Sequence, residues 1–257
     1  MEQKRFRITL ETIEPFRIGA LENPLSDVHN PVTRVGGQVV VQGSSLKGAL
    51  RAQVERHLIE NYKNVAGMKP CIPSPYSGLS EAEQQLIRDN TFKRGGACKY
   101  QEPERRRGNQ PAQQPRDDEY ICPACYLFGA QGITGFVRVP YLFSAAVPED
   151  LYAVRIDRAS GTVAERTNRD YQIIPPQAQF VGELELLWRD VVRGWELGKA
   201  RKLPAAATRG DVWLADGKWS AEKILDEFIV KRLEAIDVMG GFKSKGAGKV
   251  KIMVMAL

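Results

Sequence analysis

The chain has 257 residues and 43% of them are hydrophobic, which is enough apolar material for a folded core and excludes a mainly disordered protein. No run of about 20 apolar residues could cross a bilayer, and the N-terminus lacks the apolar core of a signal peptide, so we expect a cytoplasmic protein with no membrane partner. A formal net charge of +6 indicates a polyanionic partner, while a total of two histidines, His29 and His57, argues against histidine-dependent catalysis.

The N-terminal part of the sequence predicts two strands and a helix. Alternating apolar residues predict a strand over Arg5–Leu10, and a polar loop over Gly19–Pro31 separates it from a short strand at Gln38–Val41. Ser44 and Ser45 then offer an N-cap for a helix of about 17 residues. The apolar positions of this helix recur every four residues and keep to one face: Leu46, Leu50, Val54 and Leu58.

Regular patterning is largely absent between residues 67 and 118, where only Ser80–Arg88 predicts a short helix and Gln101–Pro115 predicts a loop. Four cysteines lie in or just after this region: Cys71, Cys98, Cys122 and Cys125. The last two form Cys-Pro-Ala-Cys, whose spacing lets two thiolates bind one metal ion, and the first two can complete a tetrahedral zinc site. Zinc would then staple an insertion at about 67–125. The alternatives are unpaired thiols or one redox pair, whereas nothing indicates the secretion that favours disulfides.

The C-terminal half predicts more strands and a second helix. The predicted strands are Gly135–Ala145, Tyr152–Asp157, Val181–Trp188 and Val250–Met255, and the helix is Glu222–Val238. The turn-like sequence Asp157–Gly161 indicates a hairpin. Without the irregular insertions the order is β–α–β–β–α–β, which is that of the ferredoxin-like fold and of the RNA-recognition motif. We therefore predict one α+β domain over residues 1–257.

The loop Gly240–Gly248 combines glycines with lysines and resembles a phosphate cradle. It is not a Walker A loop, because Lys249 is followed by Val250 and the sequence continues as a strand. Backbone amides and lysines in such a loop can bind nucleic-acid phosphates, and the candidate contacts are Lys243, Ser244 and Lys245. The alternative is an ordinary flexible connection with solvated lysines.

The start of the first helix offers a second phosphate site. Hydroxyls, amides and basic side chains in the first two turns suit an anion, and the residues concerned are Ser44, Ser45, Lys47 and Arg51. The run Arg105–Arg107 is a further candidate for RNA contact, although charge runs are usually solvated surface.

Candidates for acid–base chemistry are few. Asp27 and His29 stand close together in Ser-Asp-Val-His-Asn-Pro-Val, within the first loop. An aspartate there could bind a divalent cation or polarise a ribose hydroxyl. The alternative is turn chemistry, which aspartate favours in any loop.

Three motifs together resemble the RAMP superfamily of CRISPR effectors: Gly-Ser-Ser-Leu-Lys-Gly-Ala-Leu-Arg at Gly43–Arg51, Cys-Pro-Ala-Cys-Tyr-Leu-Phe-Gly at Cys122–Gly129, and the C-terminal Gly/Lys loop. The similarity is greatest to the repeated backbone subunit of type III (Csm/Cmr-like) complexes. Asn30-Pro31-Val32 and Val154–Arg158 fit the same subunit, so the resemblance spans nearly the whole chain.

The resemblance implies a modified RNA-recognition motif that stacks with copies of itself and with other effector subunits along a guide RNA, which pairs with a target RNA. It implies that the guide backbone is held by Ser45, Lys47, Arg51 and the Gly/Lys loop. It also implies a thumb-like hairpin at about 155–178, carrying Arg155 and Arg158, that lies between nucleotides.

In active members of the family an aspartate directly before the Asn/Ser-Pro-Val stretch cleaves the target with a divalent metal such as magnesium or manganese. Here that position is His29, and Asp27 stands two residues earlier. Either Asp27 or His29 does the work, or the subunit binds without cutting. A guide-precursor processing endonuclease and a non-catalytic RNA-binding scaffold are therefore alternative functions.

Overall fold

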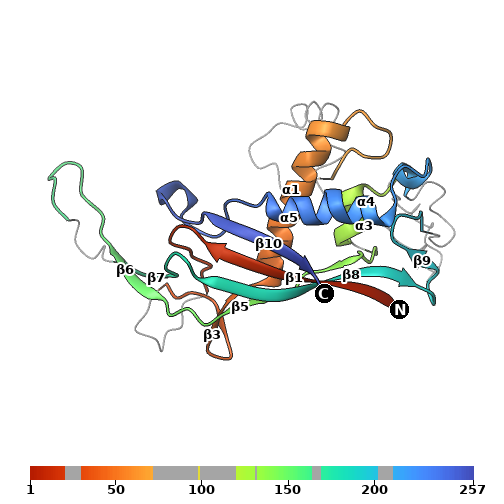
Figure 1. Ribbon diagram of the computed structural model, residues 1–257. Coiled ribbons are helices and arrows are strands. Elements are labelled where there is room, and N and C mark those ends of the chain that lie inside the picture. The colour runs from red at the N-terminus through yellow and green to blue at the C-terminus, as the bar shows by residue number, and fades with distance from the viewer. Residues whose placement is uncertain (21–29, 72–97, 99–119, 131, 164–168, 202–210) are drawn as a thin grey trace, which may run out of the picture. The chain divides into compact units, whose positions relative to one another are not determined.

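The computed structural model describes residues 1–20, 30–71, 98, 120–130, 132–163, 169–201 and 211–257 (Figure 1). They form two compact units. Unit 1 comprises the described parts of Met1–Arg5, Leu50–Arg138 and Glu185–Arg232, and unit 2 those of Phe6–Ala49, Val139–Leu184 and Leu233–Leu257. The architecture is α+β, as predicted.

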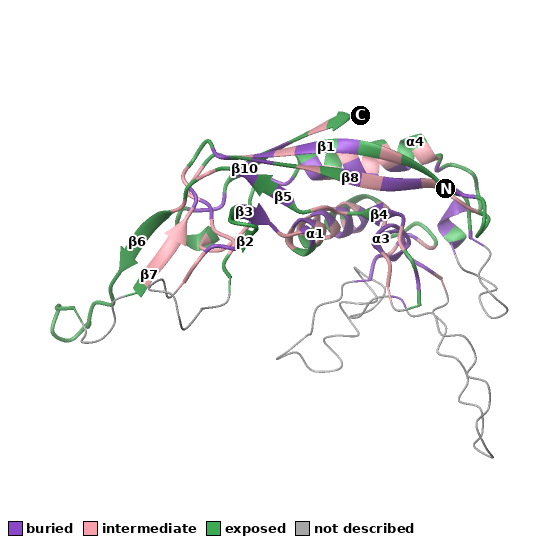
Figure 2. Cartoon of the chain, turned by 90° about the horizontal axis from the view of Figure 1, so that it is seen from below, coloured by how far each residue is buried: buried purple, intermediate pink, exposed green. Residues whose placement is uncertain are grey.

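The main sheet has the strand order β10-β1-β8-β5-β3-β2. Its strands are β1 (Glu2–Thr12), β2 (Arg34–Val35), β3 (Gln38–Val41), β5 (Leu142–Ser144), β8 (Gln179–Asp190) and β10 (Val250–Ala256). Strands β1 and β10 are antiparallel, with Phe6 opposite Ala256 and Thr12 opposite Val250. The period-two pattern predicted for β1 is confirmed, because Ile8 and Leu10 are fully buried while Arg7 is exposed. Figure 2 shows this alternation of buried and exposed residues along β1.

A separate two-stranded hairpin in unit 2 consists of β6 (Glu149–Ala153) and β7 (Arg169–Ile173), and every residue of β6 is exposed. The strand predicted over Tyr152–Asp157 is therefore placed too late. Strand β6 ends at Ala153. The expected turn is present further along, where Asp157 Oδ1 accepts hydrogen bonds from the backbone amides of Ala159 and Ser160. These hydrogen bonds also hold the pKa of Asp157 below its ordinary value.

The first helix, α1 (Gly43–Tyr62), has 20 residues and buries its predicted stripe completely. It begins before the predicted N-cap, because the carbonyl of Gln42 already accepts hydrogen bonds from the amides of Ser45 and Leu46. Ser44 and Ser45 thus lie inside the first turn and are not capping residues. A Cβ atom at Gly43 would lie 2.7 Å from the carbonyl oxygen of Val139, so only glycine fits at this start.

The strand predicted over Gly135–Ala145 is two strands, β4 (Val137–Arg138) and β5, with Pro140 between them. Proline has no amide hydrogen for the ladder, so pairing stops there and resumes at Leu142. Strand β4 pairs with β8 at Leu186 and Glu185. A further short strand, β9 (Trp195–Glu196), also pairs with β8.

The helix predicted over Glu222–Val238 is a continuous helical segment that begins and ends earlier. It comprises α4 (Ala221–Ile224), the π-helical turn η2 (Leu225–Val230) and α5 (Lys231–Glu234). Ser220 caps its start by accepting a hydrogen bond from the amide of Lys223. The helix stops before Val238 because that residue forms a β-bridge with Lys249.

Unit 1 also contains α3 (Pro123–Phe128) and the 3₁₀ turn η1 (Val212–Leu214). Around them lie aromatic side chains in mutual contact: Tyr126, Phe136, Trp213, Trp219 and Phe228. A fully buried ion pair joins Arg201 to Asp211. In the part of the chain that the structure describes, no helix is both long and apolar enough to span a membrane.

Glu227 connects η2 to α1 within unit 1. Its Oε1 atom accepts a hydrogen bond from the hydroxyl of Tyr62 and lies 2.9 Å from Nε2 of His57. Burial would raise the pKa of Glu227, but the hydrogen bonds from Tyr62 and His57 outweigh it and lower the pKa. Burial and the same carboxylate raise the pKa of Tyr62 to about 12.

We expect Glu227→Gln to lower the free energy of unfolding by about 1–3 kcal/mol at pH 7, the usual cost of disturbing hydrogen bonds to a charged group. Because the folded-state pKa lies below the unfolded value of about 4.3, the carboxylate stabilises the protein above that pH. The difference between wild type and variant should shrink as the pH falls from about 4.3 through the folded-state pKa. Urea unfolding at several pH values measures it, and the exposed Glu222→Gln is the control; a pH-independent difference would contradict this account.

Candidate metal centre and nucleic-acid interface

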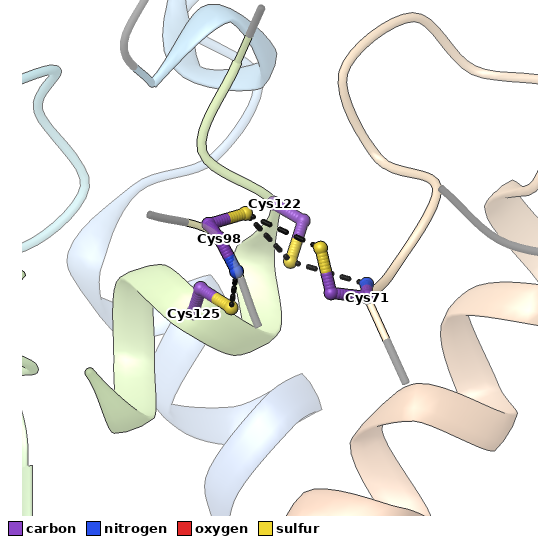
Figure 3. Close-up of side chains that lie close together, drawn as sticks. All are labelled: Cys71, Cys98, Cys122 and Cys125. Carbon is purple, nitrogen blue, oxygen red and sulfur yellow. Dashed lines mark hydrogen bonds between the residues drawn. The ribbon is translucent and has the colours of Figure 1, made fainter. Parts of the chain in front are cut away.

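The four predicted zinc ligands come together in unit 1 (Figure 3). Cys122 occupies the N-cap of α3 and Pro123 begins the helix, so one helical turn brings Cys125 back beside Cys122. All four cysteines are buried and unbridged, and their Sγ atoms lie within 4.8 Å of one another. Thiolates around a tetrahedral zinc with bonds of about 2.3 Å are about 3.8 Å apart, so this donor set fits the metal.

Backbone amides orient two of the sulfur atoms. The amide of Cys71 donates to Sγ of Cys122 at 3.4 Å, and that of Cys98 donates to Sγ of Cys125 at 3.3 Å (Figure 3). Burial raises the pKa of Cys122. The pKa of Cys125 is lowered by hydrogen bonds from the other three thiols, and the thiol of Cys122 contributes most. The cluster can therefore bind a metal such as zinc.

Arg51 also contacts this cluster. Its Nη2 atom lies 3.4 Å from Sγ of Cys125, and its Nε atom donates to Oε1 of Glu55 at 2.7 Å. Burial opposes the charge of Arg51, but Cys125 and Glu55 raise its pKa. For Glu55, burial raises the pKa by more than Arg51 lowers it.

A second cluster, in unit 2, is centred on Arg17. The guanidinium Cζ lies 5.7 Å from the ring centroid of Tyr171 on β7 and 5.3 Å from that of Phe242 in the Gly/Lys loop. The two rings meet edge to face at 4.9 Å. The amide of Gly241 donates to the carbonyl of Arg17 at 2.8 Å. A Cβ atom on Gly240 would collide with that carbonyl, so glycine is required there.

The same arginine reaches the Asn-Pro-Val motif. Its Nη2 atom donates to the carbonyl of Asn30 at 3.3 Å, and the side chain of Asn30 donates to the carbonyl of Asp170 on β7. The amide of Ala20 donates to the carbonyl of Pro31 at 3.0 Å, so the chain is paired on both sides of residues 21–29. Burial lowers the pKa of Arg17, and its Nε atom has no partner among the described residues.

The remaining predicted RNA contacts differ in exposure. Lys243, Ser244 and Lys245 form an exposed 3₁₀ turn after Phe242, whose φ of 62° is left-handed. At the other predicted segments, Ser44, Arg155 and Arg158 are exposed, and Ser45 and Lys47 are half-buried. Several predictions lie outside the described residues: Asp27 and His29, the basic run Arg105–Arg107, the helix Ser80–Arg88 and the loop Gln101–Pro115.

Sequence reasoning missed Arg17, Tyr171 and Asn30 as partners in one cluster. Phe242 was inside the predicted basic loop but was not singled out. An aromatic residue between glycines and lysines was the one available signal, since aromatic rings can stack on bases. Arg17 and Tyr171 carry no local signal, because they are brought together from positions far apart in the sequence.

The molecule is thus an α+β protein with a buried tetracysteine cluster and a basic, glycine-rich loop. The sequence pattern of the RAMP superfamily matches residues 9–251, so the chain belongs to the RAMP superfamily. Membership implies a CRISPR-associated role in RNA binding, within effector complexes that contain RNA. No curated protein matches the chain.

Proposed function

We propose that this protein is the guide-RNA-binding backbone subunit of a type III CRISPR effector complex. The observation that carries the proposal is the meeting of three segments at Arg17: the Asn-Pro-Val motif, strand β7 of the hairpin and the Gly/Lys loop. The Gly/Lys loop was expected to bind phosphate from its own chemistry, and the family resemblance implied that the hairpin and the loop before the Asn-Pro-Val motif act on RNA. Their convergence in one unit is what a single RNA path would require.

The sheet supports a ferredoxin-like, RNA-recognition-motif core. Neighbouring strands β10, β1, β8 and β5 correspond to the fourth, first, third and second strands of β–α–β–β–α–β. Helix α1 lies between β1 and β5 in the chain, and the segment α4–α5 lies between β8 and β10. Strands β2 and β3 then extend the edge beyond β5.

The guide backbone is bound by groups that present positive charge or N–H donors to phosphate. The exposed turn of Lys243 and Lys245 provides charge, and the start of α1 provides Ser44, Ser45 and Lys47. The hairpin β6–β7 acts as the thumb. Near its tip, apolar side chains that are about half exposed accompany exposed arginines and can lie between bases: Val154, Arg155, Ile156 and Arg158.

Zinc, when bound, would supply four bonds that tie Cys71 and Cys98 to the start of α3. Cys71, Cys98, Cys122 and Cys125 would hold it. The role of this centre in the proposal is structural, because four protein ligands leave no open coordination position for substrate.

Cleavage of the paired target RNA is the catalytic part of the proposal. It is supported by the placement of Asn30, which is fixed by Arg17 and Asp170 beside the hairpin and close in sequence to Asp27 and His29. A carboxylate from Asp27, with a divalent metal, would orient the ribose 2′-hydroxyl for in-line attack on the adjacent phosphate.

Binding of the guide should weaken steeply with salt, since each neutralised phosphate releases counterions with a slope of roughly −0.7 per contact for single strands. Replacing Lys243 and Lys245 with alanine should flatten the slope of log affinity against log salt by about 1.4, without changing sequence preference. Fluorescence anisotropy with a labelled guide at several salt concentrations measures this.

The matched control is Lys199→Ala with Lys231→Ala, which removes the same charge from exposed positions of unit 1. A salt slope that changes equally in both double variants would show that the binding depends on the overall charge of the protein and not on this loop.

RNA of uniform repeat-derived sequence should copurify with the wild-type protein. Conversion of an unprocessed precursor by the isolated protein would instead favour the processing endonuclease.

A further inference from the structure

The side chain of Arg51 contacts the cysteine cluster and a neighbouring acid on α1. The side chain is 13% exposed, and it spans Oε1 of Glu55 and Sγ of Cys125. The resemblance to the family implied a phosphate contact for this residue. A side chain with two of its three nitrogen atoms already directed at protein partners is poorly placed to reach RNA as well.

The metal centre needs a positive neighbour. Four thiolates around one Zn²⁺ carry a net charge of −2, and a buried charge of this kind is costly unless nearby groups compensate it. Two backbone amides offer partial charges to Sγ of Cys122 and Sγ of Cys125. Arg51 adds a full positive charge at Cys125.

We propose that Arg51 is a positioning residue of the metal centre, whose guanidinium offsets the charge of the zinc–thiolate cluster at Cys125. This inference rests on the proposed zinc site. Glu55 holds the guanidinium through its Nε atom and leaves Nη2 facing the sulfur. Because Glu55 is itself an acid, its negative charge opposes the stabilisation that Arg51 gives. The carboxylate of Glu55 therefore orients Arg51, but it does not help to offset the negative charge of the zinc–thiolate cluster.

The phosphate contacts of α1 then come from its first turn. Ser44 and Ser45 precede Arg51 by about two turns, and Ser44 is exposed. The helix then has two functions along its length: its start binds RNA, and its third turn supports the metal.

The test is the rate at which the zinc-loaded full chain gives up its metal to excess chromogenic chelator. Loss of an outer partner of a metal ligand typically costs about 10–100-fold in metal affinity. We expect Arg51→Met to release zinc at least about tenfold faster than wild type, and Arg51→Lys to restore part of the retention. The control Arg56→Met removes an exposed arginine from the same helix and should match wild type.

Glu55→Gln separates charge from packing. It keeps the shape and one acceptor but removes the negative charge, so zinc release should be as slow as in wild type or slower. Release as fast as in Arg51→Met would overturn the proposal, because the ion pair on the helix and not the charge at Cys125 would then matter. Equal rates for Arg51→Met and Arg56→Met would overturn it as well.

Cobalt gives a second readout that a purely structural role would not move. Thiolate-to-Co²⁺ charge-transfer absorption should shift in Arg51→Met and not in Arg56→Met, since only the former changes the field at a sulfur ligand. If Arg51→Met does not fold, the same comparison is made with Arg51→Gln, which also removes the charge, and release and spectrum equal to those of Arg56→Met then overturn the proposal. A wild-type chain without zinc would instead refute the proposed metal centre itself.

Discussion

Replacing Cys122 with serine should abolish zinc binding and sharply destabilise unit 1. The wild-type protein is expected to contain one zinc per chain, held by four buried sulfur atoms. Structural zinc contributes about 10–16 kcal/mol to folding in small zinc-finger peptides. If a third of this applies here, the loss of about 4 kcal/mol corresponds to a fall in Tm of about 8–16 °C. Metal analysis and thermal unfolding of the two proteins measure the effects.

Chelator treatment is the matched control, because it removes the metal without changing the sequence. Chelated wild-type protein should unfold at nearly the same temperature as Cys122→Ser. Added zinc should restore only the wild-type protein, and added magnesium should restore neither, since thiolates do not favour magnesium. Protein purified without chelator that contains no zinc would show that the cluster is an apolar packing of thiols.

Local periodicity was sufficient to predict most regular elements. The strands β1, β3 and β8 and the buried face of α1 follow from apolar spacing alone, because a period of two or of about four needs no tertiary information. The start of α1 could not be predicted in this way. It depends on the approach of Gly43 to Val139, which lies almost a hundred residues away in the sequence.

Breaks and irregular turns were the parts that sequence did not predict. Pro140 interrupts a run whose alternation otherwise continues, and the π-helical turn η2 keeps the apolar spacing of an ordinary helix. In both places the apolar residues keep the spacing of a regular element, but the backbone hydrogen bonds differ from those of that element. The hydrophobic pattern therefore predicts which side chains are buried, and it does not predict which backbone groups form hydrogen bonds.

The two candidate sites also differ in how far the sequence alone could predict them. The cysteine cluster was predictable because thiolates have few structural uses and Cys-Pro-Ala-Cys has the spacing of metal ligands. The Arg17 cluster was not, because a lone arginine, tyrosine or phenylalanine has many uses. The cluster can be recognised as a candidate RNA site only in the folded structure, where β7 and the Gly/Lys loop both contact Arg17.

Cleavage of a matched target RNA by the guide-loaded complex should require Asp27 and a divalent metal. Asp27→Ala should lower the rate at least about a hundredfold, the lower range for a positioned acid–base group. Asp27 is the nearest carboxylate to the Asn-Pro-Val motif in sequence, and Asn30 is fixed by Arg17. The control Glu22→Gln alters the next acid along the same segment and should cleave at the wild-type rate.

His29 is the direct rival, since it occupies the position directly before Asn30. A mechanism through Asp27 should survive His29→Ala and stop when magnesium and manganese are withheld. A mechanism through His29 should fail with His29→Ala and continue without these ions, because an imidazole can assist 2′-hydroxyl attack by itself. Zinc content must be measured in every sample, so that loss of the structural metal to a chelator is not mistaken for loss of the catalytic one. If the wild-type complex leaves matched RNA intact with either ion present, both mechanisms are wrong and the subunit binds RNA without cutting it.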